Sequence, residues 1–166
     1  DILTADIIQP VHAGAGNLYS VEYFRLARRA LAPHGVMMQW DGIRPASEYK
    51  LIVRTFLTAF PHATAWVNGS LLVGTTEPLQ LDAAAFAAKL SHPSTRSALA
   101  LVDITSFDSL LSLYTAGPES LRALIGPGLI LTDDRPLVEY HRSPPAGERD
   151  IDVTGLRDDV QRWVGR

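Results

Sequence analysis

The sequence has 166 residues, of which 46% are hydrophobic and 20% are charged, a composition typical of a globular domain with a hydrophobic core. The formal net charge of −3 argues against nucleic acid as a partner, because domains that bind nucleic acid carry a basic excess. The lack of cysteine excludes disulfides, thiolate zinc sites and cysteine nucleophiles, and it fits a reducing compartment such as the cytoplasm. No apolar run reaches the roughly 18 residues of a membrane-spanning helix.

The first twenty residues organise the rest of the chain. An apolar run over residues 2–5 ends at Asp6 and predicts a buried parallel strand. A loop that contains His12, Gly14 and Gly16 follows, and Ser20 is a good N-cap for an amphipathic helix over residues 21–32. An apolar strand closed by a carboxylate and a glycine-bearing loop is typical of α/β proteins, in which the strand end delivers a side chain into a crevice. We therefore take Asp6 as the first candidate functional residue.

The next elements continue an α/β pattern. Residues 36–40 predict a second buried strand, residues 45–60 a second helix, and Asn68-Gly69 a hairpin turn between strands over 62–67 and 70–75. The order strand, helix, strand, helix, hairpin is that of the second half of a doubly wound sheet. We therefore expect residues 1–77 to form such a half, and an upstream part of the same protein to supply the other half.

Residues 78–166 predict a mostly helical C-terminal extension. Its expected helices cover residues 81–90, 94–101, 107–114 and 118–125, a short strand covers 137–140, and a terminal helix covers 153–164. Half a sheet would expose the first strand as an apolar edge. We therefore expect the chain either to form a homodimer through that edge or to cover the edge with its C-terminal helices.

Several segments together carry a family resemblance: DILTADIIQP, HAGAGNLYSVEYFRLARRALAPHGVMMQW, YKLIVRTFLTAFPHATAW, NGSLLVG and TDDRPLVEY. In their order and spacing they resemble the spermidine synthase family of aminopropyltransferases, and more closely its bacterial spermidine-synthase-like branch, over most of residues 1–142. The resemblance implies a Rossmann-like fold of the class I methyltransferase type. It also implies transfer of an aminopropyl group from decarboxylated S-adenosylmethionine to a polyamine. Members of that branch often have membrane-spanning segments upstream, which would attach the whole protein to a membrane.

The resemblance also assigns candidate site residues. Asp6 matches the acid that helps to deprotonate and position the attacking amine, and Gln9 stands where the family has a second, amine-binding acid. Carboxylates suit this chemistry because a polyamine is cationic and must lose a proton before nitrogen can attack carbon. Gln9 can bind an amine through hydrogen bonds but carries no charge. His12 and Tyr19 would lie around the amine pocket, and Asp133 could bind a cationic substrate.

The family's nucleoside-binding turn and acid lie upstream of the position of Asp6. No cofactor-binding residue is therefore assigned, and we expect this chain alone to bind no cofactor and to be inactive.

Other interpretations of the same motifs remain open. The His12–Gly16 run could form the oxyanion loop of an esterase, but that interpretation needs a Gly-x-Ser-x-Gly elbow, and the sequence has none. A gate over the amine pocket is the preferred role for this loop. Asp133-Asp134 favours a turn over a metal site, because no further ligand lies at metal spacing. Two alternatives for the whole protein are methyl transfer from S-adenosylmethionine and a non-catalytic module for polyamine binding or assembly.

Overall fold

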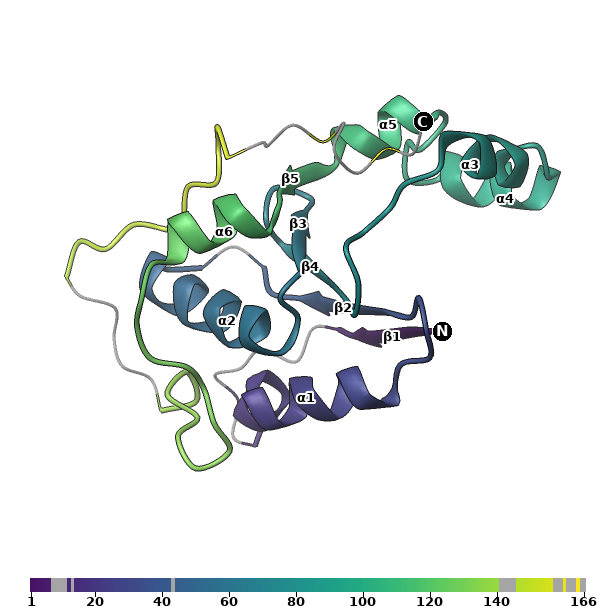
Figure 1. The fold of residues 1–166 in the computed structure, drawn as a ribbon. Helices are drawn as coiled ribbons and strands as arrows, with labels where there is room; N and C mark the ends of the chain where they lie inside the picture. The colour runs from purple at the N-terminus through teal and green to yellow at the C-terminus, as the bar shows by residue number, and fades with distance from the viewer. Residues whose placement is uncertain are drawn as a thin grey trace.

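The computed structural model describes residues 1–6, 12, 14–42, 44–140, 146–156, 160 and 164. They form a mixed α/β fold in which helices pack on a five-stranded sheet (Figure 1). The elements in chain order are β1 (Ile2–Ala5), η1 (Gly16–Tyr19), α1 (Val21–Ala30), β2 (Val36–Trp40), α2 (Ala46–Ala59), β3 (Thr64–Trp66), β4 (Leu71–Thr75), α3 (Ala83–Leu90), α4 (Pro93–Ala100), α5 (Phe107–Ser112), β5 (Tyr114–Ala116) and α6 (Pro118–Ile125).

The sheet combines one parallel pair with an antiparallel set. Its strand order is β1-β2-β4-β3-β5; β1 runs parallel to β2, and the other neighbouring pairs are antiparallel. The helix α1 makes the crossover that a parallel pair needs. The order strand, helix, strand, helix, hairpin is thus confirmed, whereas membership of the Rossmann-like class remains a prediction.

The hairpin turn has the predicted local chemistry. Asn68 and Gly69 have φ angles of 54° and 86°, and the Ser70 N–H donates to the Val67 carbonyl over 3.1 Å. Asn and Gly tolerate these positive angles, which match the twist of the flanking strands. Ser20 also caps α1 as predicted, because its hydroxyl accepts a hydrogen bond from the Tyr23 N–H over 3.1 Å.

One core lies between the sheet and the helices α1, α2 and α6. Phe24 and Phe56 meet edge to face with ring centroids 4.9 Å apart, and Phe60 stacks on Phe56. Gly74 of β4 lies directly under these rings. A Cβ at Gly74 would sit 2.6 Å from the Phe60 ring, so only glycine allows this close approach of strand and helix. This core fixes α1 and α2 against the sheet.

A second, smaller cluster covers the other face of the sheet. Because strand residues alternate between faces, Trp66 and Val73 point away from the main core and pack with Leu111 and Tyr114. In Figure 1, α3, α4 and α5 gather beyond the end of β5, away from α1. None of the residues of α3 or α4 is buried, so this helix pair adds little to either cluster.

The structure corrects three predictions in the C-terminal extension. The helix predicted over residues 107–114 stops at Ser112, and Tyr114–Ala116 is instead the fifth strand, where Trp66 packs edge to face on Tyr114. Residues 137–140 form turns, because Pro136 and short turn hydrogen bonds replace ladder pairing.

The start of the terminal helix is the third correction. Residues 153–156 are irregular and the Thr154 N–H bonds the Asp152 side chain, a local contact that competes with helix formation. Most of the remainder of the predicted helix, residues 157–159 and 161–163, lies outside the described residues.

The main core also draws on both sides of the predicted boundary at residue 77, since Ala116, Leu121, Leu131 and Val138 belong to it. The division into two segments at that residue remains a prediction. None of the helices in the described part of the chain has the length and apolar character needed to cross a membrane.

Within the described residues, β1 pairs only with β2 and its other edge is free. The helices α3 to α6 do not lie along it (Figure 1), and dimerisation through this edge remains a prediction.

We expect the chain to dimerise through the free edge of β1. Ile2, which is 68% exposed, would then lie close to the interface, and an Ile2→Lys variant should be monomeric, because a charge on an edge strand blocks pairing. Sedimentation velocity at a chain concentration of roughly tens of micromolar distinguishes the dimer from the monomer. Leu101→Lys, at an 87% exposed position beyond α4, is the matched control and should still dimerise. A monomeric unmodified chain would contradict the prediction.

Candidate functional site

The carboxyl ends of β1 and β2 meet at one edge of the sheet because the two strands are parallel. Ala5 pairs with Gln39, so Asp6 follows β1 at the level where β2 ends. Asp6 is exposed to solvent, whereas Gln39 is 2% exposed. The end of β1 thus carries an accessible carboxylate, and the neighbouring strand β2 carries a buried amide; both kinds of group are suited to bind an amine.

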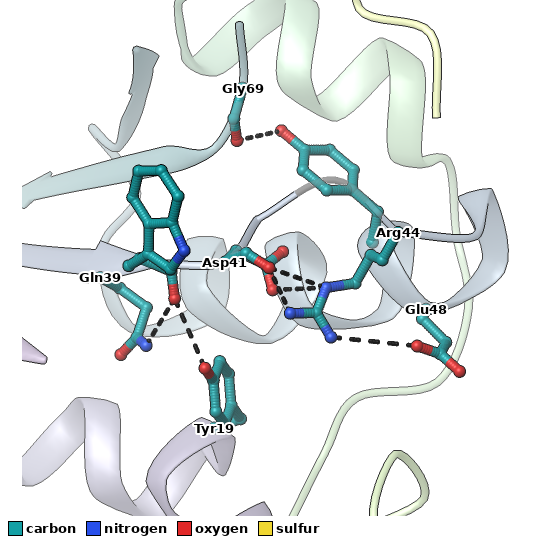
Figure 2. A network of polar contacts seen from close by, with 8 residues as sticks. Tyr19, Gln39, Asp41, Arg44, Glu48 and Gly69 are labelled. Carbon is teal, nitrogen blue, oxygen red and sulfur yellow. Dashed lines mark hydrogen bonds and ion pairs between the residues drawn. The ribbon is translucent and has the colours of Figure 1, made fainter. Parts of the chain in front are cut away.

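The Trp40 main-chain carbonyl joins two of the surrounding side chains. The Gln39 Nε2 donates to it over 3.0 Å and the Tyr19 hydroxyl donates over 3.4 Å (Figure 2). The Gln39 Oε1 is buried and accepts no hydrogen bond from the described residues. A buried acceptor without a partner is costly, so this oxygen is available to a donor that enters the site.

Behind this edge, Asp41 forms a buried ion pair. Its side chain is fully buried, and the Arg44 Nε lies 2.9 Å from its Oδ1. Arg44 also donates to the Asp41 main-chain carbonyl through Nε and Nη2, and its Nη1 lies 3.9 Å from Glu48 (Figure 2). Neither carboxylate oxygen accepts a well-directed hydrogen bond from the described residues. Arg44 thus neutralises Asp41 and folds the β2–α2 connection back on itself.

Burial dominates the electrostatics of these groups. It raises the pKa of Asp41 to about 7, against the opposing effect of Arg44. Burial, reinforced by the nearby Asp41 charge, also raises the pKa of Tyr19 to about 12 and moves the pKa of Tyr49 upward. The Tyr49 hydroxyl is a donor, to the Gly69 carbonyl over 3.0 Å. Both phenols are therefore neutral hydrogen-bond donors near pH 7.

The glycine loop after Asp6 is held by a distant carboxylate. The Gly14 N–H donates to the Glu139 Oε1 over 2.8 Å, and the Gly16 N–H donates to its Oε2 over 3.3 Å. Inside the loop, the Ala15 N–H bonds the His12 carbonyl over 2.9 Å. The segment around Glu139 therefore packs against residues 14–16, at the start of η1.

The predicted site residues occupy different environments. His12 is exposed in the glycine loop, and Tyr19 is only 2% exposed with its hydroxyl on Trp40. Asp133 is exposed, and its N–H donates to Glu22 at the start of α1 over 3.1 Å. It lines a hollow of about 380 Å³ beside η1 and α1. These contacts do not involve Asp6. Gln9 lies outside the described residues.

Sequence reasoning missed Gln39, Asp41 and Glu139. A signal for Gln39 was present, because it is the one polar residue in the apolar run VMMQW. Asp41 was interpreted only as part of an Asp-Gly turn, and nothing local distinguishes it from an exposed turn aspartate. Glu139 lies 125 residues from Gly14, a distance at which sequence patterns carry no contact information.

The described residues contain no cluster of three or more histidine, aspartate or glutamate side chains that could hold a metal ion. Asp133 and Asp134 form a turn instead, closed by a hydrogen bond from the Arg135 N–H to the Thr132 carbonyl over 2.9 Å. The turn predicted for this pair is confirmed.

Comparison with known proteins gives one informative similarity. Over 69 residues, the chain is 36% identical to the polyamine aminopropyltransferase of Aeropyrum pernix, which covers 40% of this chain. The match spans 22% of the length of that relative. No protein-family model matches the chain, and no solved structure matches it significantly. The chain is thus similar in part to a polyamine aminopropyltransferase, as the sequence motifs suggested.

Replacing Asp41 with Asn should flatten the pH dependence of stability. An acid whose pKa is raised by folding stabilises the fold below its unfolded pKa of about 3.9 and loses this contribution as pH rises to about 7. From pH 5 to pH 7.5 this group should lower the free energy of unfolding by about 2 kcal/mol, and the Asn variant should lack that loss.

Urea unfolding at the two pH values tests this, with exposed Asp134→Asn as the charge-matched control. Equal pH slopes for the Asp41→Asn variant and the unmodified chain would contradict the assignment.

Proposed function

We propose that this chain carries the amine-binding part of an aminopropyl-transfer site, in a protein related to the spermidine synthases. The partial identity to a polyamine aminopropyltransferase carries the proposal. The exposed Asp6, at the carboxyl edge of the parallel pair β1–β2, supports it independently, because this is where α/β proteins bind ligands. In this proposal the cofactor-side residues belong to an upstream part of the same protein.

The proposed chemistry is a nucleophilic displacement. The substrate amine gives its proton to Asp6 and attacks the aminopropyl carbon of decarboxylated S-adenosylmethionine, while the carbon–sulfur bond breaks and methylthioadenosine leaves. Asp6 suits the role of base because it is a solvent-accessible carboxylate that a cationic amine can reach. The Gln39 Oε1, which is buried and has no partner among the described residues, is a second acceptor for an N–H group of the substrate at this edge.

Asp6→Asn tests both parts of this assignment. In the longer protein, loss of the base should lower the transfer rate about a hundredfold or more, measured as methylthioadenosine release. In this chain, loss of the exposed charge should weaken spermidine binding about two- to fivefold by calorimetry.

Asp103→Asn is the matched control, because Asp103 is exposed after α4 and asparagine accepts its φ of 58°. An unchanged transfer rate in the Asp6→Asn protein would refute the role of Asp6. Release of S-adenosylhomocysteine would assign methyl transfer instead, and spermidine binding without either by-product would assign a binding module.

A further inference from the structure

The glycine loop and the segment of residues 131–140 form a contact that the proposed chemistry does not use. A single carboxylate, that of Glu139, accepts the N–H groups of both Gly14 and Gly16, over 2.8 Å and 3.3 Å. Backbone N–H groups that converge in this way make a concave site for an anion. Hydrogen bonds to a charged acceptor are also stronger than neutral ones.

The loop is built for this close approach. A Cβ at Gly16 would lie 2.6 Å from the Pro136 Cβ and 2.7 Å from the Glu139 Oε2, so a side chain there would force the two segments apart. Gly14 has a φ of 80°, a conformation that side chains other than glycine rarely adopt. The binding of the Glu139 carboxylate thus explains both glycines.

The segment that carries Glu139 is anchored on two helices. The Leu131 carbonyl accepts the Val21 N–H of α1 over 2.9 Å, and the Leu131 N–H donates to the Thr55 hydroxyl of α2 over 2.9 Å. Leu131 and Val138 are both buried in the main core. Glu139 therefore belongs to a segment that is fixed on the core, and it holds Gly14 and Gly16 in place.

We infer that Glu139 is a positioning residue for the site at Asp6. By accepting the N–H groups of Gly14 and Gly16, Glu139 fixes the start of η1, whose last residue Tyr19 donates to the Trp40 carbonyl at the end of β2. This hold on η1 keeps the edge preformed and raises its affinity for a cationic amine. The effect on amine affinity rests on the proposed function. The contact of Glu139 with Gly14 and Gly16 rests on the geometry alone.

Amide hydrogen exchange followed by NMR tests the hold without any substrate. In Glu139→Gln, which keeps the side-chain shape but cannot accept at both positions, exchange of the Gly14 and Gly16 amides should quicken about fivefold or more. The Ala15 amide, bonded within the loop, is the internal reference. Asp134→Asn removes an equal charge from the same segment and should leave both glycine amides unchanged. Unchanged exchange in Glu139→Gln would overturn the inference.

Spermidine titration of the same variants tests the effect on the site. Glu139→Gln should weaken binding about threefold or more, because η1 would no longer be held in its preformed position, and Asp134→Asn should not. In an Asp6→Asn background the Glu139→Gln change should add little further loss. Equal weakening by the Glu139→Gln and Asp134→Asn changes would indicate bulk charge and overturn the positioning role.

The two proposals fail separately. If Glu139→Gln changes neither spermidine binding nor the exchange of the Gly14 and Gly16 amides, the positioning role of Glu139 is refuted. The proposed function is then unaffected. If the unmodified chain does not bind spermidine, both the proposed function and the positioning role are refuted. Faster exchange of the Gly14 and Gly16 amides in Glu139→Gln would still show that Glu139 holds these two residues.

Discussion

The parallel pairing of β1 with β2 is the constraint on which the site depends. Parallel strands cannot be joined by a tight turn, so the chain must cross over, and α1 provides the crossover by burying Val21, Phe24 and Ala27 against the core. The consequence is that both strands end at the same edge. Asp6 and Gln39, which are 33 positions apart in the sequence, become neighbours only for this reason.

The polar groups at this edge are tolerated because the surrounding core is well packed. Burying a charge is expensive unless it is paired, and Arg44 provides the pairing for Asp41 from only three residues away. Tyr19 and Gln39 share the Trp40 carbonyl, which leaves one amide oxygen without a partner among the described residues. Such an incomplete network costs stability, and violations of this kind are found mainly at functional or strained sites.

The sequence predicted what depends on local chemistry. The parallel strand before Asp6, the Ser20 cap and the Asn68-Gly69 turn each have a short-range physical signature, and each forms. The burial predicted for that strand was wrong, because β1 lies at an edge of the sheet and none of its residues is buried. The predicted helix over residues 107–114 failed at its end because tertiary pairing with β3 outweighed the helical pattern at Tyr114.

The same limit applied at the site. The exposed Asp6 and the turn at Asp133 followed from local pattern. The burial of Asp41 depends on the fold around it. The contact of Glu139 with Gly14 joins residues 125 positions apart, so neither feature had a local signature.

Three carboxylates near this edge show how environment assigns roles to identical groups. Asp41 is buried and neutralised by Arg44, so it can shape the β2–α2 connection but cannot reach a substrate. Glu139 is committed to the amides of Gly14 and Gly16. Asp6 alone of these three is exposed with its charge free to meet a cation. Asp41 and Glu139 therefore act on the chain around this edge, and Asp6 is the one of the three that a cation from solvent can reach.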